Sequence, residues 1–302
     1  MAFGFDVAAL PAYTDQLSLD LISKVVLKTD LLDYVDLHSG FASGTVAINL
    51  VDADLPVSAL SCGWTSDGQV TYTQVNVIID SLQSKTEMCV ETLRSKFLSS
   101  FMSAGTGNDF IPFEEVISES YTDKLRKYNE GYLINGAGAA GTGTGIKAQI
   151  TSANGATLQA GIPAAWTATN AYEQALDLYD GIAESVKDRD DLIIVVSPDA
   201  YRALVRALVA QNLYHFNSVD GNDIMILPGT NATVVKSSGL VGSDYKFAGP
   251  GKMIIAATGL TDELDTFRFF YDEASDVMKF RAAWRLGVGV GEVNLFATND
   301  MA

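Results

Sequence analysis

Three observations predict an α+β fold for this chain. Long stretches of helical periodicity precede position 131, strand-forming residues alternate in 37–80 and again in 266–297, and short apolar strands take turns with helices between 171 and 257. A run of glycine, alanine and threonine at 135–145 separates the first part from the second, and it is the best candidate for a domain boundary. With 302 residues, of which 48% are hydrophobic, the chain can bury a full core.

The composition excludes several classes of function. The formal net charge of -17 would repel the phosphate backbone that supplies most non-specific affinity for nucleic acids. Cys62 and Cys89 are too few for a disulfide framework, and the first basic side chain, Lys24, comes too late for an export signal. We therefore expect a protein made and kept inside a cell. No run approaches the ~20 apolar residues that cross a bilayer, so no membrane span is expected.

The N-terminal region predicts an arm followed by a projecting hairpin. Residues 12–28 carry apolar side chains at helical spacing, which predicts a helix on the arm. Strand formers then alternate through 37–80, broken by glycines and by the turn signal Asp67-Gly68, and predict a long pair of strands. Because two strands alone are marginally stable in water, we expect a neighbouring subunit to stabilise this hairpin.

Two helices are predicted between the hairpin and the glycine-rich segment. Apolar residues at every fourth position predict a helix over 86–102, with Thr86 as its N-cap and Gly105 as its stop signal. Pro112 opens a second periodic stretch, which predicts a long amphipathic helix over 113–131. This second helix leads into the glycine-rich segment.

Beyond residue 145 the pattern is typical of alternating helices and strands. Asn170 and Glu173 have the spacing of a capping box at the start of a helix that continues to 186. Ser197 and Pro198 predict the N-cap and first turn of another helix. The expected strands are 192–196, 224–227, 232–235, 253–257, 266–271, 277–285 and 288–297.

No motif predicts a catalytic residue, a cofactor site or a metal site. The segment 136–141 fits G-x-G-x-x-G, but a dinucleotide site needs a preceding strand and an acidic residue downstream, and here a helix is expected to precede it. His38 and His215 lack ligand spacing with the cysteines. The acidic cluster at 188–191 favours a solvated loop over a cation site, and the glycosylation sequence at Asn231 has no meaning in a protein that is not secreted.

The order of these elements resembles the major capsid protein of tailed bacteriophages, the Hong Kong 97-like fold that encapsulins share. The stretches 113–136 and 141–146 resemble the family's spine helix and the passage that follows it. Residues 171–201 resemble the helix, the central strand and the Ser-Pro turn of its axial domain, and 267–271 and 280–288 resemble its closing strands. Each pattern is short, so the resemblance rests on their order and spacing along nearly the whole chain.

The resemblance implies a shell subunit with a defined division into domains. It implies a structural protein, not an enzyme, that assembles into hexamers and pentamers of an icosahedral capsid around double-stranded DNA. Such a chain would reside in the host cytoplasm before assembly and in the virion afterwards. The implied parts are an N-terminal arm at 1–37, an extended hairpin loop at 38–85, a peripheral domain at 86–144 and 262–302 with the spine helix at 113–131, and an axial domain at 145–261.

The resemblance also implies partners. They are further copies of the chain, a portal protein, a separate scaffolding protein and a cement or decoration protein. Some members cross-link a lysine of the extended loop to an asparagine of a neighbour, but no Lys or Arg occurs between His38 and Asp80, so we expect a shell without covalent cross-links. The negative charge fits a shell that encloses DNA without binding it by sequence.

Aromatic and basic side chains are the candidates for contacts between subunits. Ordinary packing within the hairpin and solvated helix faces explain these residues about equally well. The candidates are Phe41, Trp64 and Tyr72 on the hairpin and Arg94, Lys96, Arg202 and Arg206 on the expected helices.

Two alternatives to a virus capsid stay open. The first keeps the fold but makes the chain the shell subunit of an encapsulin-like compartment that holds a cargo enzyme. The second is a soluble α/β protein that binds a small molecule on 171–257. Such a pocket needs convergent polar groups, and the sequence offers no cluster to form them.

Overall fold

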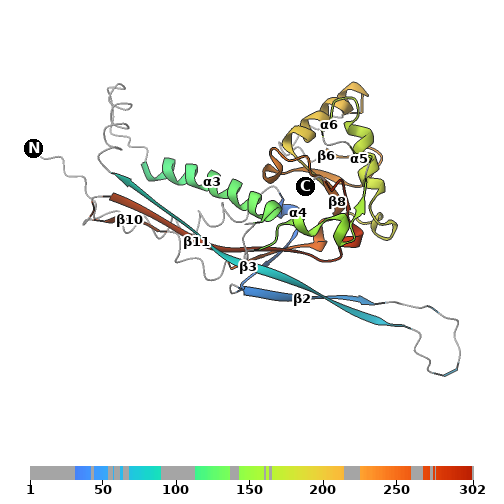
Figure 1. Ribbon diagram of the computed structural model, residues 1–302, viewed down its shortest axis with the longest axis horizontal. Coiled ribbons are helices and arrows are strands. Elements are labelled where there is room, and N and C mark those ends of the chain that lie inside the picture. The colour runs from blue at the N-terminus through green and yellow to red at the C-terminus, as the bar shows by residue number, and fades with distance from the viewer. Residues whose placement is uncertain are drawn as a thin grey trace, which may run out of the picture.

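The computed structural model describes residues 31–41, 44–53, 57, 62–63, 68–89, 113–136, 143–159, 161–162, 165–213, 225–259, 268–272, 275 and 277–300. Figure 1 shows an elongated sheet with a long helix lying along it and a compact domain at one end. The helices are α3 (Phe113–Asn135), α4 (Ile146–Gln149), α5 (Ala171–Asp180) and α6 (Pro198–Ala210). Short 3-10 turns are η2 (Leu32–Tyr34), η4 (Ser152–Asn154), η5 (Glu184–Val186), η6 (Ser238–Leu240), η7 (Gly251–Met253) and η9 (Val293–Leu295). The α+β class is confirmed.

The elongated sheet is built around two long strands. Its order is β1-β9-β11-β3-β2, and β10 pairs with the free part of β11. Strand β3 pairs with β2 over its first half and with β11 over its second half, so the hairpin continues into the sheet without a break. The strands are β1 (Asp36–Ser39), β2 (Gly44–Ala53), β3 (Val70–Cys89), β9 (Ile254–Thr258), β10 (Arg268–Asp272) and β11 (Val277–Val290).

The compact domain contains a second sheet of six short strands. Its order is β4-β12-β8-β5-β7-β6, and α5 and α6 contact each other and the sheet. Every residue of the central strand β5 is buried, as expected for an apolar strand covered on both faces. The strands are β4 (Thr157–Leu158), β5 (Leu192–Val196), β6 (Met225–Ile226), β7 (Thr233–Lys236), β8 (Phe247–Pro250) and β12 (Ala297–Thr298).

Helix α3 covers one face of the elongated sheet. Along β11 the even-numbered side chains Phe280, Ala282 and Trp284 are buried. The ring of Tyr121 stacks on Phe280 with centroids 4.7 Å apart, and Trp284 Nε1 donates a hydrogen bond of 2.9 Å to Asn129 Oδ1. Alternate side chains of β11 therefore pack against the apolar face of α3, the predicted spine helix.

A buried carboxylate joins α3 to the compact domain. Glu130 is only 2% exposed, and its Oε1 accepts hydrogen bonds from Ser237 Oγ at 2.7 Å and from the backbone N of Ser238 at 2.9 Å. Its Oε2 accepts from Ser238 Oγ. Gly239 lies so close that an added Cβ would meet the Glu130 carbonyl oxygen at 2.6 Å. The long helix is thus fixed to the turn η6.

The helix expected over 86–102 is wrong at its start. Thr86 is not an N-cap, because 86–89 are the last residues of β3 and Thr86 pairs with Phe280 of β11. Residues from 90 onwards in that helix lie outside the described part of the chain. Apolar side chains at every fourth residue also fall on one face of a strand, since four is a multiple of two, and pairing with β11 decides between the two structures.

Two further details of the sequence prediction are corrected. The strand expected at 277–285 and the first residues of the strand expected at 288–297 form one continuous strand, β11. Gly287 allows this continuity, because a Cβ at this position would lie only 2.4 Å from the Ile78 carbonyl oxygen of β3. The capping box at Asn170 is wrong, because its Oδ1 turns back and accepts from Thr167 N at 2.7 Å. By contrast, Ser197 Oγ accepts from the Ala200 backbone N and confirms the cap of α6.

The two sheets divide the chain in an interleaved way. Strand β9 comes from the range 145–261 and lies in the elongated sheet, whereas β12 comes from 262–302 and lies in the compact domain. The last described strand, β12, accordingly lies in the compact domain. The four-part division of the chain therefore stays a prediction.

Several expectations fall outside the described residues. They include the arm helix over 12–28 and the candidate residues Trp64, Arg94 and Lys96. Within the described ranges, none of the helices combines the length and the apolar character that a membrane span needs.

The Glu130 contact predicts a large loss of stability on substitution. Glu130→Ala leaves buried serine hydroxyls and a backbone N–H without their acceptor, so the free energy of unfolding should fall by about 3 kcal/mol. Urea denaturation of the purified chain measures this. Exposed Asp188 is the control, and Asp188→Ala should change stability by no more than about 0.5 kcal/mol. Equal effects of the two substitutions would contradict this account.

Candidate subunit interface

The base of the hairpin has a small core on one face. Val46 lies opposite Val77 and Ile48 lies opposite Val75 across β2 and β3. These side chains form a cluster with buried Ala257, and half-buried Phe41 packs against it. The hairpin therefore has more internal support near its base than a free pair of strands.

The distal end of the hairpin leaves apolar side chains uncovered in the single chain. Val51 is 60% exposed and lies directly opposite Tyr72, which is 72% exposed. Val70 and Val57 are also largely exposed. Side chains that lie opposite each other on antiparallel strands share one face of the sheet, so Val51 and Tyr72 form one apolar surface. We call these two residues and Val70 the distal apolar surface.

A carboxylate fixes the base of the hairpin to α3. Asp80 Oδ2 accepts hydrogen bonds from the Tyr132 hydroxyl and from the backbone N of Gly143. Burial, and then the hydrogen bond to Asp80, raise the pKa of Tyr132 well above its usual range. The phenol therefore stays protonated and donates to the carboxylate at any physiological pH, which holds the direction in which the hairpin leaves the sheet.

The face of the elongated sheet opposite to α3 carries two adjacent cations. Arg281 of β11 and Lys85 of β3 lie directly opposite each other and are exposed. Like charges placed opposite one another across strands are destabilising. We call Arg281 and Lys85 the cation row.

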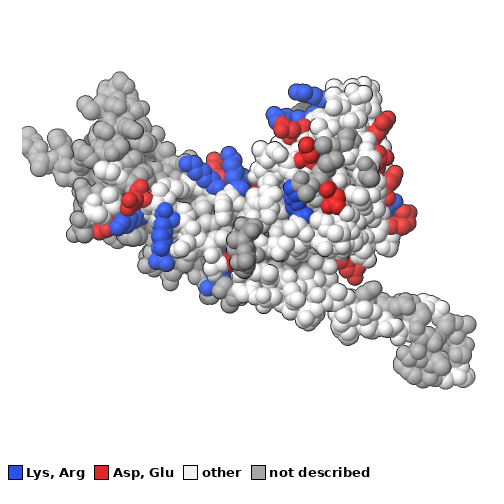
Figure 2. Space-filling view, viewed as in Figure 1, with Lys and Arg blue, Asp and Glu red and all other residues white. Residues whose placement is uncertain are grey.

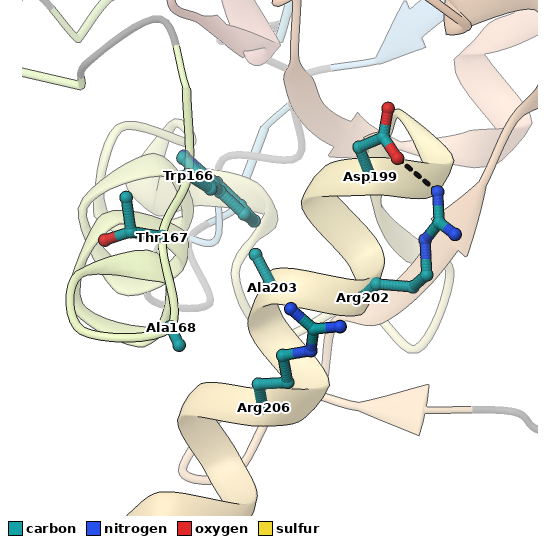
Figure 3. A pocket seen from close by; sticks show the side chains of 7 residues that line it. All are labelled: Trp166, Thr167, Ala168, Asp199, Arg202, Ala203 and Arg206. Atoms are coloured by element: carbon teal, nitrogen blue, oxygen red, sulfur yellow. Dashed lines mark hydrogen bonds and ion pairs between the residues drawn. The ribbon is translucent and has the colours of Figure 1, made fainter.

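A groove in the compact domain contains two of the predicted interface residues. Arg202 and Arg206 of α6 line a cavity of about 370 Å³ together with Asp199, Trp166 and neighbouring residues, as Figure 3 shows. Arg202 forms an ion pair with Asp199. Arg206 is exposed, and among the described residues nothing pairs with it. The groove thus presents positive charge beside a buried indole.

A buried lysine lies over the indole that lines this groove. Lys246 is only 1% exposed, and its Nζ is 5.4 Å from the centre of the Trp166 ring. The ammonium also donates to the backbone oxygen of Asp244 at 2.8 Å. Burial lowers the pKa of Lys246 to about 8, because the charged form loses most of its hydration.

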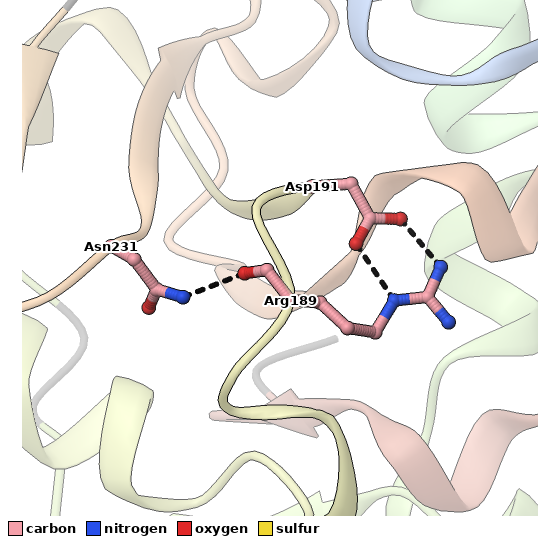
Figure 4. A network of polar contacts seen from close by, with 3 residues as sticks. All are labelled: Arg189, Asp191 and Asn231. Atoms are coloured by element: carbon pink, nitrogen blue, oxygen red, sulfur yellow. Dashed lines mark hydrogen bonds and ion pairs between the residues drawn. The ribbon is translucent and has the colours of Figure 1, made fainter.

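The acidic cluster at 188–191 is organised by a cation of the chain itself. Arg189 donates from Nε and Nη2 to the two carboxylate oxygens of Asp191, at 2.8 and 2.7 Å. Figure 4 shows this fork beside Asn231, whose Nδ2 donates to the Arg189 carbonyl oxygen at 2.6 Å. Asn231 is thus a structural residue of the loop. Within the described ranges no group of three or more His, Cys, Asp or Glu side chains could hold a metal ion.

The structure separates the predicted interface residues into distinct places. Phe41 packs at the base of the hairpin, Tyr72 belongs to the distal apolar surface, and Arg202 and Arg206 lie on the compact domain. Sequence reasoning missed Val51 and the cation row. Both depend on the register between strands, which the one-dimensional pattern does not contain.

Neither a family model nor a curated protein matches the sequence, but solved structures match the fold. The capsid of a native GTA particle aligns with a TM-score of 0.58 at 15% identity, covering 89% of this chain and 88% of that chain. The virus-like particle from Pyrococcus furiosus aligns with a TM-score of 0.55 at 12% identity, covering 95% and 98%. The satellite phage P4 procapsid aligns with a TM-score of 0.55 at 10% identity, covering 94% and 98%.

These likenesses show that the chain has the Hong Kong 97-like capsid fold. Each alignment covers nearly the whole of this chain and nearly the whole of the matched chain. The hairpin, the long helix and the compact domain therefore belong to one architecture. The resemblance inferred from the order of elements in the sequence is confirmed at the level of the fold.

The buried lysine predicts a pH-dependent stability. The pKa of Lys246 is near 10.5 in the unfolded chain and about 8 in the folded chain. Below pH 8 the buried ammonium therefore lowers the free energy of unfolding, and this free energy increases as the pH rises from 8 to 10.5. Relative to Lys246→Met, the wild-type free energy of unfolding should rise by about 2 kcal/mol between pH 7 and 10. Urea denaturation at several pH values measures the difference, and a constant difference would contradict the assignment.

Proposed function

We propose that this chain is the major capsid protein of a tailed bacteriophage, a structural subunit without enzymatic activity. Copies assemble into hexamers and pentamers, which form an icosahedral shell around packaged double-stranded DNA in the virion. The observation that carries the proposal is the agreement of the fold with capsid proteins over 89% of this chain. The finer residue-level argument rests on the uncovered surfaces of the single chain.

The distal apolar surface supports assembly with further copies of the chain. Val51 and Tyr72 lie far along a two-stranded projection (Figure 1), where no other described part of the chain covers them. Such side chains gain about 25 cal/mol for each Å² of apolar area that a partner removes from water. A neighbouring subunit is the partner that a shell of identical chains supplies at every hairpin.

The charges of the chain favour a particular place for that hairpin. Between His38 and Asp80 the sequence has three aspartates and neither lysine nor arginine. The cation row on the elongated sheet has the opposite charge. We propose that the hairpin of one copy lies over the cation row of the next, because this relieves the repulsion among the cations and covers the distal apolar surface.

The virus shell is favoured over the two alternatives. An encapsulin-like compartment has the same fold, and its distinguishing feature is a cargo enzyme in place of a genome. A small-molecule-binding protein would need an enclosed pocket with convergent polar groups. The groove at α6 is instead partly open to solvent, and one of its two guanidinium groups is already paired with Asp199 (Figure 3).

Further partners follow from the proposed shell. They are a portal protein, a scaffolding protein and a cement or decoration protein, all present in the host cytoplasm during assembly. The shell encloses DNA without reading its sequence, in keeping with the net charge of -17.

Electron microscopy of purified particles tests the proposal. Wild-type protein, expressed alone and with the proteins encoded beside it, should form rings of five or six and closed shells in negative stain. Val51→Ser with Tyr72→Ser should reduce the assembled fraction at least tenfold by light scattering, because the distal apolar surface loses the area that a neighbour would bury. A wild-type protein that stays monomeric under both conditions would overturn the proposed function.

The control for the hairpin variant is another exposed valine. Val241 is 69% exposed and lies on the compact domain, so Val241→Ser removes a similar apolar group from a different surface. Assembly of this control should match the wild type. DNA or a cargo enzyme in purified shells then distinguishes the virus capsid from the encapsulin-like alternative.

The absence of a lysine in the hairpin predicts a shell held by non-covalent contacts. An isopeptide bond to an asparagine needs an amine nucleophile, and residues 38–80 contain no lysine. Purified shells boiled in detergent should therefore run as a single band at the mass of the monomer, 32.3 kDa. A ladder of multiples of this mass on a denaturing gel would refute the prediction.

A further inference from the structure

Helix α5 carries a stripe of acidic side chains at helical spacing. Glu173, Asp177 and Asp180 are exposed and stand four and three residues apart, so they lie on one face of the helix. Within the described residues no ion pair holds Glu173 or Asp177, and Asp180 lies near Lys187. Like charges at this spacing destabilise an isolated helix. We call Glu173, Asp177 and Asp180 the acidic stripe.

The neighbouring helix α6 carries the opposite charge at a matching spacing. Arg202 and Arg206 are exposed and four residues apart, which places them about 6 Å apart along the helix axis. Glu173 and Asp177 have the same separation. Arg202 is held by Asp199 on the same helix, whereas Arg206 extends over the groove beside Trp166 (Figure 3). We call Arg202 and Arg206 the basic edge.

The two charged surfaces lie on different sides of one domain. Figure 2 shows acidic side chains gathered along the outer edge of the compact domain, over α5 and the segment after it, and basic side chains at its upper end, over α6. The two helices contact each other in the domain, yet no ion pair joins the acidic stripe to the basic edge among the described residues. Among the described residues, one chain therefore leaves Glu173, Asp177 and Arg206 without an ion-pair partner.

We propose that the acidic stripe of one copy docks on the basic edge of the next copy around a ring. This inference rests on the proposed shell and names the second surface by which its subunits recognise one another. Two different surfaces of one chain form a heterologous contact, which closes into a ring when the rotation between copies allows it. The side chains of Glu173 and Asp177 meet Arg202 and Arg206 of the neighbour. Glu173, Asp177 and Arg206 thereby gain partners, and Arg202, which Asp199 already holds, gains a second carboxylate.

Charge reversal on each surface tests the contact. Arg202→Glu with Arg206→Glu makes both surfaces acidic, and Glu173→Lys with Asp177→Lys makes both basic. Each double variant should lower the assembled fraction at least tenfold in light scattering and electron microscopy. In a chain with all four substitutions the two surfaces have exchanged their charges, so this chain should assemble again. Arg206→Ala, which adds no new charge, should reduce assembly at least threefold.

Mixing the two double variants gives a sharper test. An acidic variant contacts only a basic one, so the two must alternate around a ring. Alternation closes a ring with an even number of subunits and not one with an odd number. The mixture should therefore form rings of six or extended hexagonal sheets and no rings of five, whereas the chain with all four substitutions should form both.

A matched control separates the contact from net charge. Lys124→Glu with Lys127→Glu reverses two exposed cations of α3 and changes the net charge by the same amount as the change on the basic edge. Circular dichroism verifies that each variant is folded. If the α5 and α6 variants assemble like the wild type, or if the α3 control is impaired equally, the inference fails and the shell itself stands. A wild type that forms no assembly overturns the proposed function instead.

Discussion

The continuous pairing of β3 is the constraint on which the rest of the structure depends. Its first half pairs with β2 and its second half with β11, so one strand of 20 residues belongs to both the projection and the sheet. Because β3 is paired along its whole length, first with β2 and then with β11, the direction of the sheet also sets the direction of the hairpin. Asp80, close to the change of partner, accepts from Tyr132 and Gly143 and adds a fixed point at that position. The hairpin can therefore hold apolar side chains far from the core in a defined position.

Two glycines of β11, which have no side chain, allow this strand to lie very close to β3. A Cβ at Gly287 would meet the Ile78 carbonyl oxygen at 2.4 Å, and one at Gly289 would meet the Val77 side chain at 2.6 Å. These positions lie where β11 leaves β3 and continues alongside β9. Glycine weakens a strand through its entropy, and here that cost is accepted because any larger residue would separate the two strands. On the other face of β11, Trp284 and Phe280 pack against α3. One strand therefore lies close to β3 through its glycines and buries apolar side chains under the helix.

The sequence predicts the elements of this fold better than its interfaces. Apolar periodicity identified α3, α6 and β5, because each buries one face or both faces in the chain itself. It failed at Thr86, where a spacing of four residues is compatible with helix and strand and only the partner β11 distinguishes them. The distal apolar surface and the cation row depend on which residues face each other across strands, and this register is set by tertiary structure. Arg202 and Arg206 were predicted only as basic residues on an expected helix. The structure places both on α6 beside one groove, and their role between subunits stays a prediction.

The two kinds of proposed contact suit different mechanical tasks in a shell. Rings of five and six require the same surfaces to meet at different angles. Packed apolar side chains lose about a quarter to a half of their contact energy over a gap of 0.5–1 Å, so the distal apolar surface favours one geometry. Charge attraction falls only as the inverse of distance, so guanidinium and carboxylate groups tolerate a change of angle with less loss. The charged contact between compact domains would thus allow the angle between subunits to vary. The apolar contact at the far end of the hairpin would hold its two partners in one geometry.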